Sequence, residues 1–280
     1  TLQQLKNLSG HVTVSYVDPL ANPKFYYNYT EEEPVNNSLI VEGAKGSVVI
    51  SYDDIYQYDM NYSSYQYTVT GYDGEGQILS AISRVMMEEQ PKLYLIMGHD
   101  ELAFEESFLN MLEKENLAYE NLNLNTVDEV PEDAQGIIIN APAGDYSEED
   151  VDKILRYLEQ GGNALIAPVW TDSEMQGFAR ILDYYGVSLV DGLIIEEDRE
   201  HYYQIPYWLF PEVEDTDVTQ RVSGGAVFVP YASGLMYEED EDDLLYTPFL
   251  MTSSDAFSKQ DIFDGEDYSR STDAVDGPFV

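Results

Sequence analysis

The amino-acid sequence predicts an α/β protein with a parallel sheet in its longer, C-terminal part. Two observations predict this fold class. From residue 93 onward, short apolar strands alternate with amphipathic helices, an order typical of a parallel sheet covered by helices. The 280 residues are enough for two ordinary domains, and 44% of them are hydrophobic, which is enough to build cores. We therefore predict two domains, residues 1–90 and residues 91–280.

The first ninety residues are predicted to form one small module. Alternating apolar and polar residues predict a strand over residues 11–17, and Pro23 suits the first position of a short helix that Asn22 caps. The predicted elements are a helix end over 2–8, that strand, the short helix over 22–29, hairpin strands over 38–42 and 47–52, and a helix over 76–89 that buries Ile78, Leu79, Ile82 and Val85. This order resembles the later part of a thioredoxin-like module without its redox cysteines.

The second domain is predicted to be flavodoxin-like, with a doubly wound parallel sheet. Ser147 and Asp150 occupy capping-box-like positions at one helix start, and Gly161 and Gly162 end that helix. The predicted strands are residues 93–97, 118–124, 136–140, 163–168 (a buried strand) and 187–190, and the predicted helices are residues 104–116, 147–159 and 173–185. Short strands over 226–229 and 250–252 are expected to return to the sheet, and the six acids of residues 238–243 are predicted to form a solvated loop.

The charge balance and the cysteine count exclude several classes of function. Thirteen basic residues stand against 54 acidic ones, a formal net charge of −41, and a surface this acidic repels nucleic acid and anionic membrane surfaces. The charge either keeps an exposed domain in solution or binds cations, and a calcium site is one form of the second interpretation. The absence of cysteine excludes disulfides, thiolate nucleophiles and zinc–thiolate sites.

The candidate binding residues follow the predicted parallel strands, because ligands bind at the carboxyl ends of strands in doubly wound sheets. These residues are His99, Asp100 and Glu101 after the first strand, Asn140 after the third and Trp170 after the fourth. One interpretation is that His99 and Glu101 act as a general-base pair or as metal ligands. The other is that Asp100 caps the following helix while the neighbouring side chains interact with the positive end of the helix dipole. The sequence holds no Gly-x-Ser-x-Gly, His-Glu-x-x-His or phosphate-loop motif, so no cofactor is predicted.

Tyrosines concentrate in the first domain, where eleven of the 24 lie between Tyr16 and Tyr72. Tyrosines that alternate along strands are typically half-buried sheet residues whose hydroxyls reach water. The alternative interpretation is an aromatic platform for sugars or a partner protein.

The chain begins at Thr1 without a methionine and shows neither a signal peptide nor a stretch of roughly 20 apolar residues that could span a membrane. It ends after Val280, at a point where the sequence pattern predicts the start of a strand. We expect the sequence to be an excised soluble portion of a longer protein.

An ordered series of short motifs resembles the GldG-type proteins, which are auxiliary components of ABC transporters named for gliding motility. The motifs are Val17-Asp18-Pro19 with Asn22-Pro23, Gly74-Glu75-Gly76-Gln77 with Ala81-Ile82, Lys92-Leu93-Tyr94 running into Gly98-His99-Asp100-Glu101, Val130-Pro131-Glu132-Asp133-Ala134, Ala141-Pro142, Tyr157-Leu158 with Gly161-Gly162, Met251-Thr252-Ser253-Ser254, and Gly277-Pro278. The resemblance implies an extracytoplasmic region held between membrane helices. It also implies a second domain related in fold to class I glutamine amidotransferases and to a domain of intraflagellar transport proteins. Those amidotransferases need a cysteine, so only their scaffold is implied here.

We therefore expect a non-enzymatic, extracytoplasmic binding or scaffolding domain of an ABC transporter accessory protein at the cell membrane. Its expected partners are membrane-embedded transporter subunits or other envelope proteins, with a glycan or a peptide as further ligands. The loops around His99, Asn140 and Trp170 are the expected contact surface. Two alternatives stand beside this one: a hydrolase acting on surface glycans through His99 and Glu101, and a carbohydrate-binding surface protein that uses the N-terminal tyrosines.

Overall fold

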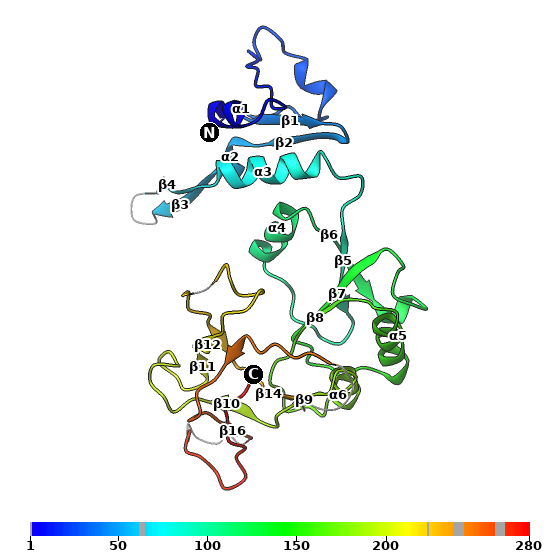
Figure 1. Ribbon diagram of the computed structural model, residues 1–280, viewed down its shortest axis with the longest axis vertical. Coiled ribbons are helices and arrows are strands. Elements are labelled where there is room, and N and C mark those ends of the chain that lie inside the picture. The colour runs from blue at the N-terminus through cyan, green and yellow to red at the C-terminus, as the bar shows by residue number, and fades with distance from the viewer. Residues whose placement is uncertain (1, 62–64, 223, 238–243, 261–266) are drawn as a thin grey trace. The chain divides into compact units, whose positions relative to one another are not determined.

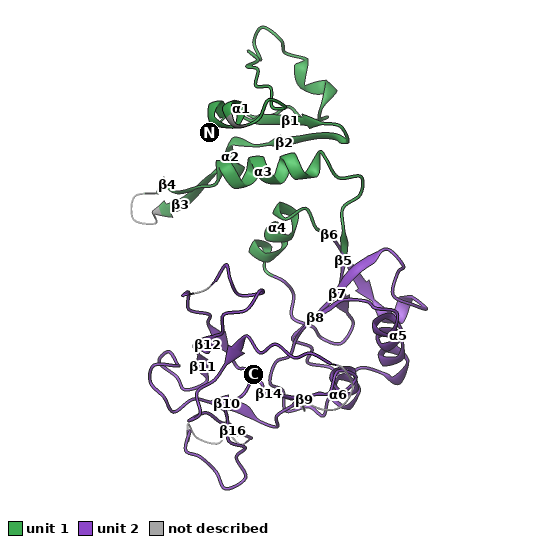
Figure 2. Cartoon of the chain, in the orientation of Figure 1, with its two compact units in different colours: residues 1–92, 105–118 green, residues 93–104, 119–280 purple. Residues whose placement is uncertain are grey.

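The computed structural model describes residues 2–61, 65–222, 224–237, 244–260 and 267–280 (Figure 1). The chain forms two compact units, which Figure 2 distinguishes by colour. Unit 1 contains Thr1–Lys92 together with Glu105–Ala118, and unit 2 contains Leu93–Phe104 together with Tyr119–Val280. Residues 105–118 thus belong to unit 1 although they follow the first strand of the parallel sheet. The division into domains at residue 90 stays a prediction.

Unit 1 consists of two β-hairpins and several helices around a small apolar core. Its elements are α1 (Leu2–Leu8), the 3₁₀ turn η1 (Phe25–Asn28), β1 (Leu39–Gly43), β2 (Gly46–Ile50), α2 (Tyr52–Ile55), β3 (Tyr56–Asn61), β4 (Gln66–Tyr72), α3 (Gly74–Arg84) and α4 (Glu106–Lys114). β1 pairs with β2 and β3 with β4, both antiparallel, which confirms the first hairpin. The core is formed by Ile50, Ile55, Ile78 and Ala81, on which Leu2 and Leu5 also pack.

Three predictions for the N-terminal part are wrong. Residues 11–17 form no strand and Tyr16 is 85% exposed, since an alternating pattern gives a strand only where a neighbouring chain supplies hydrogen-bond partners. The helix predicted over 22–29 is only the 3₁₀ turn η1. This turn begins at Phe25, with Lys24 and not Asn22 in the N-cap position. Leu79 is 52% exposed because α3 directs Ile78 and Ala81 to the core.

Helix α4 is attached to α3 by polar contacts within unit 1. The side-chain amide of Asn116 donates to the carbonyl oxygen of Ser80 at 3.0 Å, and the Ser80 hydroxyl donates to the carbonyl of Lys114. The ammonium of Lys114 forms an ion pair with Asp73, just before α3. These contacts explain why α4, whose pattern predicts a helix of the second domain, belongs to unit 1.

Unit 2 contains a four-stranded parallel sheet with the strand order β6-β5-β7-β8. Its elements up to the last helix are β5 (Lys92–Met97), β6 (Ala118–Asn123), η2 (Leu124–Thr126), β7 (Ala134–Asn140), α5 (Glu148–Glu159), β8 (Ala164–Ala167) and α6 (Gln176–Asp183). The sheet confirms the predicted parallel α/β class, whereas the flavodoxin-like and thioredoxin-like assignments stay predictions. β8 lies at the edge of the sheet and Leu165 is 55% exposed, so the prediction of a buried strand there is wrong.

The core of unit 2 lies between the sheet and helices α5 and α6. Ile139 on β7, Ile154 on α5 and Ile181 on α6 are fully buried in it. Ser147 caps α5 as predicted, because its hydroxyl accepts a hydrogen bond from the Asp150 amide at 3.2 Å. These packed helices fix the loops that precede them.

The C-terminal part of unit 2 is built from two-stranded antiparallel ladders. Its strands are β9 (Val187–Leu189), β10 (Leu193–Ile195), β11 (Trp208–Leu209), β12 (Glu212–Val213), β13 (Val229–Pro230), β14 (Leu235–Tyr237), β15 (Leu250–Met251) and β16 (Phe257–Lys259). They pair as β9–β14, β10–β16, β11–β13 and β12–β15. The predictions that residues 187–190, 226–229 and 250–252 join the parallel sheet are therefore wrong. The acidic run 238–243 lies outside the described residues.

Within the described residues, none of the helices combines the length and apolar character required to cross a lipid bilayer.

Candidate functional site

Two loops at the carboxyl edge of the sheet, one after β5 and one after β7, are bonded to each other. The amide of Leu102 donates to the carbonyl of Asn140 at 2.9 Å, and the Asn140 side-chain amide donates back to the carbonyl of Leu102 at 2.7 Å. The amide of Gly144 donates to the carbonyl of His99 at 2.8 Å. The structure therefore brings two of the predicted segments, around His99 and Asn140, into one layer.

The same loops contain left-handed backbone. Gly98 has φ +122°, which glycine adopts without strain, but Asp100 and Ala141 have φ +55° and +48°. Non-glycine residues in this region cost about 1 kcal/mol or more each and persist where the surroundings impose them. The hydrogen bonds between the two loops supply that constraint.

His99 is buried between two carboxylates. Its Nδ1 lies 3.1 Å from Glu101 Oε1, and its Nε2 lies 3.2 Å from Asp150 Oδ2. The imidazole stacks on the ring of Tyr146, with centroids 3.7 Å apart and planes 16° from parallel. The side chains of His99, Glu101 and Asp150 are each 5% exposed or less. Because each ring nitrogen faces a carboxylate oxygen, both nitrogens donate and the ring carries a positive charge.

Further donors complete this arrangement, which we call the His99 cluster (His99, Glu101, Tyr146, Asp150 and Lys153). The Tyr146 hydroxyl donates to Glu101 Oε1 at 2.7 Å, and the His99 amide donates to Glu101 Oε2 at 2.8 Å. The Lys153 ammonium lies 3.5 Å from Asp150 Oδ1 and donates to the carbonyl of Leu124 at 2.9 Å. The Lys153 ammonium also pairs with Glu149 Oε1 at 2.9 Å, so every charged group of the cluster has a partner inside unit 2.

The pKa values in the His99 cluster are displaced by burial and by these bonds. Burial alone favours the neutral form of every member, but the hydrogen bonds with Glu101 and Asp150 outweigh it and raise the pKa of His99. Burial is likewise outweighed at Glu101, where the hydrogen bonds from His99 and Tyr146 lower the pKa to about 2. Burial and the Glu101 hydrogen bond raise the pKa of Tyr146. These shifts favour the ionised acids and the protonated imidazole.

The sequence-predicted residues do not all meet. Asp100 is exposed, and α4 begins at Glu106 with Glu105 as its N-cap residue, so the interpretation of Asp100 as a helix cap is wrong. His99 and Glu101 do pair, but Asp150, which completes the cluster, was predicted only as a helix-capping residue. Trp170 lies in a separate cleft.

This cleft, which we call the Trp170 cleft, opens where the chain leaves β8. It has a volume of about 760 Å³ and is lined by residues 169–176, 179, 180, 183, 187–192, 233 and 260. Asp172, Glu174, Asp183 and Asp191 make its lining acidic, and Arg180 is its single basic residue. Its volume is typical of small-molecule sites.

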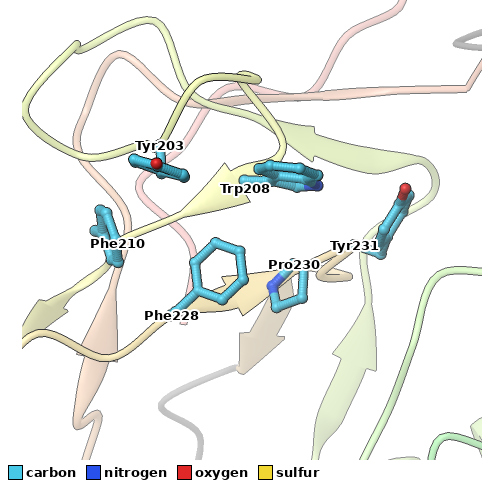
Figure 3. Close-up of a pocket in the computed structure, with 6 residues that line it drawn as sticks. All are labelled: Tyr203, Trp208, Phe210, Phe228, Pro230 and Tyr231. Carbon is cyan, nitrogen blue, oxygen red and sulfur yellow. The ribbon is translucent and has the colours of Figure 1, made fainter. Parts of the chain in front are cut away.

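A second cleft, which we call the aromatic cleft, lies on one face of the β11–β13 ladder and escaped the sequence analysis. It has a volume of about 550 Å³, and its lining is shown in Figure 3: Tyr203, Trp208, Phe210, Phe228, Pro230 and Tyr231. Alternate residues of an extended chain share a face, so Trp208 lies beside Phe210, and Phe228 beside Pro230. Leu209 points the other way and is 3% exposed in the core.

The rings of the aromatic cleft surround its opening on several sides. In Figure 3, Tyr203 and Trp208 close one side, with ring planes 12° from parallel and centroids 6.4 Å apart, and Phe228 lies opposite. Trp208 and Phe228 meet at 87°, with centroids 6.1 Å apart. The Tyr231 ring packs against Tyr207, and their ring centroids are 5.0 Å apart. Burial and the hydrogen bond with Tyr231 raise the pKa of Tyr207 to about 12.

The β3–β4 hairpin of unit 1 presents exposed tyrosines. Tyr65 is 80% exposed, Tyr67 72% and Tyr72 56%. These side chains are far more open to solvent than half-buried sheet residues are, which favours the interpretation of this hairpin as a contact surface.

No group of three or more histidine or acidic side chains in the described part of the chain is arranged to hold a metal ion. The acids of the His99 cluster are instead occupied by the imidazole, the tyrosine hydroxyl and the lysine ammonium.

The fold and these sites define an α/β protein with a buried histidine cluster beneath the carboxyl edge of its parallel sheet, an open cleft after β8 and a second open cleft on the β11–β13 ladder. Residues 90–274 match the family described as ABC-type uncharacterized transport system. The chain belongs to this family, in agreement with its resemblance to the GldG-type auxiliary proteins.

Two solved structures are similar to parts of the chain. The N-terminal domain of mmIFT52 is 14% identical, and the match covers 59% of this chain and 74% of that domain with a TM-score of 0.45. PurLQS from Thermotoga maritima is 13% identical, and the match covers 55% of this chain and 72% of that one with a TM-score of 0.28. Among curated proteins, none matches the chain.

Proposed function

We propose that this chain is a non-enzymatic, extracytoplasmic binding or scaffolding region of an accessory protein in an ABC transport system. The family match over residues 90–274 supports the transport role. One observation carries the binding role: the Trp170 cleft opens directly after β8, at the carboxyl end of the parallel sheet, where proteins with such sheets bind their ligands. The proposed partners are membrane-embedded subunits of the transporter or other envelope proteins.

The loops after β5 and β7 are proposed as part of the same contact surface. Asp100 and Ala141 hold left-handed backbone there, and such strain is concentrated at functional sites. Asp100 is exposed, whereas His99 and Glu101 are buried beneath it. We assign to the His99 cluster the role of fixing the loops, and to Asp100, Asn140 and Trp170 the contacts with a partner.

The arrangement of His99 favours binding over catalysis. A general base needs a nitrogen lone pair that a substrate proton can reach. Both nitrogens of His99 face carboxylates, and the ring is covered by Tyr146. This geometry argues against the alternative of a glycan hydrolase that uses His99 and Glu101.

Cysteine labelling tests the extracytoplasmic placement. Because the chain has no cysteine, Leu20→Cys adds a single thiol at a side chain that is 92% exposed, and Ile139→Cys adds one that is fully buried. In intact cells that make the complete protein, a membrane-impermeant maleimide is expected to label the Leu20 variant. The buried variant and the parent protein serve as controls. Labelling of the Leu20 variant only after the membrane is broken contradicts the placement.

Site-specific crosslinking tests the contact surface. A photo-crosslinking amino acid at Ser173, an exposed residue that lines the Trp170 cleft, is expected to capture a subunit of the same transport system. The matched control is Glu132, exposed in unit 2 but outside the lining. Equal capture from both positions, or capture from neither, contradicts the proposed surface.

A carbohydrate-binding surface is the second candidate function, favoured by the exposure of the hairpin tyrosines. Sugars stack on exposed aromatic rings, and Tyr65 and Tyr67 are 80% and 72% exposed. A glycan array that binds the wild-type chain but not the double variant Tyr65→Ala/Tyr67→Ala would support this function. Unchanged binding by the double variant would exclude these tyrosines.

A further inference from the structure

The aromatic cleft is not required by the core on which it lies. Leu209 and Val229 form the inner face of the β11–β13 ladder and pack into the core of unit 2. The outer face of such a ladder faces water and is ordinarily polar. Here it has Trp208, Phe210 and Phe228, of which Phe228 is 48% exposed. Cross-strand packing of the rings stabilises a ladder, but it does not need rings left open around a cleft of about 550 Å³.

The lining of the aromatic cleft restricts the chemistry of its ligand. Among the described residues, the six that line it offer aromatic faces, a proline ring, two tyrosine hydroxyls and one indole N–H, and none of the six is charged or has a side-chain amide. A sugar or an anion needs several polar partners in its site, which this lining lacks. Aromatic faces have negative electrostatic potential and attract organic cations.

The charge of the chain segment that forms the aromatic cleft favours the same class of ligand. The stretch from Glu196 to Tyr231, which supplies all six lining residues, has eight acidic and two basic residues. One of the two bases, Arg199, lies with its guanidinium 4.9 Å from the centre of the Tyr202 ring and donates to the Tyr202 hydroxyl at 2.7 Å. Neither Arg199 nor Tyr202 lines the cleft. The chain segment that forms the cleft is therefore predominantly acidic, and the lining holds no positive group that would repel a cation.

We propose that the aromatic cleft binds a small organic cation with a quaternary ammonium group, through the faces of Trp208, Phe210 and Phe228. The methyl groups of such a cation supply the apolar contact that the rings need, and its charge needs no hydrogen-bond acceptor. The rings of Tyr203 and Tyr231 close the site at its edges (Figure 3). This site shares no lining residue with the Trp170 cleft, although the Trp170 amide donates to the carbonyl of Tyr231 at 3.3 Å. Each proposal therefore stands or fails by its own test.

Fluorescence titration tests the charge requirement. The chain has two tryptophans, so Trp170→Phe leaves Trp208 as the single indole reporter, inside the proposed site. Choline and tetramethylammonium are expected to change its emission, and choline is expected to bind about tenfold more tightly than 3,3-dimethyl-1-butanol, its neutral analogue. Sodium chloride at equal ionic strength is the salt control. Equal affinity for choline and the neutral analogue, or no binding of either cation, overturns the proposal.

Substitutions test whether the rings supply the affinity. Phe228→Ala and Tyr203→Ala remove rings that are each 48% exposed, and each is expected to weaken choline binding about fivefold. Tyr184→Ala, at a tyrosine that is 40% exposed and outside the lining, is the matched control and is expected to leave binding unchanged. An equal effect of all three variants, or of none, overturns the proposal.

Fluorinated tryptophan separates a cation–π contact from simple apolar packing. Fluorine reduces the negative potential of the indole face while the size of the ring is nearly kept. Successive fluorination of Trp208 in the Trp170→Phe protein is expected to weaken choline binding stepwise. Isothermal titration calorimetry measures the choline affinity of each protein. Affinity that does not fall with fluorination overturns the assignment of a cation site, and this result does not depend on whether the alanine variants fold.

Discussion

Replacement of Glu101 by glutamine is expected to destabilise unit 2 by an amount that depends on pH. Glu101→Gln keeps the size of the side chain and removes the charge that faces His99 Nδ1 at 3.1 Å. The Tyr146 hydroxyl donates to Oε1 and the His99 amide to Oε2, whereas glutamine has a single oxygen, so the change removes one of these two hydrogen bonds together with the charge. The pH-dependent part of the difference reports the charge. The loss of one partner leaves the imidazolium of His99 with Asp150 as its only carboxylate within the His99 cluster.

The magnitude follows from the pKa of Glu101. The structure lowers this pKa from 4.5 to about 2, and the side chain is only 5% exposed, so solvent screening is small. Each factor of ten in proton affinity corresponds to about 1.4 kcal/mol, which gives about 3 kcal/mol of folding free energy. Because the folded pKa is the lower one, this contribution is complete above pH 4.5 and is lost as the pH falls to about 2.

Urea unfolding at a series of pH values measures this difference. Both tryptophans, Trp170 and Trp208, belong to unit 2, so tryptophan emission follows the unit that contains Glu101. The wild type is expected to exceed Glu101→Gln by about 3 kcal/mol above pH 4.5, and the two are expected to converge toward pH 2. A difference that is constant over this range, or smaller than 1 kcal/mol as an order-of-magnitude limit, contradicts the charged interpretation of the His99 cluster.

Three further predictions concern stability. Because the structure raises the pKa of His99, its contribution is complete below pH 6.5 and is lost as the pH rises through the folded value, so alkaline titration is expected to destabilise the wild type but not His99→Gln. Ser147→Ala removes the N-cap of α5 and is expected to cost about 1 kcal/mol in urea unfolding, and a change below a few tenths contradicts the cap. Gly177→Ala places a Cβ against the carbonyl oxygen of Tyr146, closer than van der Waals contact allows. Calorimetry is therefore expected to show a lower melting temperature, whereas an unchanged one contradicts this close contact.

The parallel sheet was predictable from the sequence because its signals are local. Each strand is a short apolar run between turn residues, and Ser147 marks a helix start within its own segment. The later strands were misassigned because strand pairing depends on distant residues. The pattern of residues 187–190 predicts a strand, but only the structure shows that β9 pairs with β14 instead of joining the sheet. The same reason explains the failure at residues 11–17.

The candidate site was predictable in part. The position of His99 and Glu101 at a strand end follows from sequence order, whereas their pairing with Asp150 joins residues 51 positions apart and has no local signal. The aromatic cleft did have a signal, since Trp208 alternates with Phe210 and Phe228 with Pro230. That signal was hidden because each ladder strand is only two residues long and prolines and acids surround it.

The two faces of the β11–β13 ladder separate folding from recognition at the level of single residues. Leu209 and Val229 belong to the core, while their immediate neighbours in sequence line the aromatic cleft. Related chains can therefore exchange Tyr203 or Phe228 and acquire a different ligand without losing the fold. In this family, we expect amino-acid substitutions to accumulate faster at the outer-face positions of the ladder than at the inner-face positions. The difference between these two substitution rates then measures how much the ligand of the cleft has changed among related proteins.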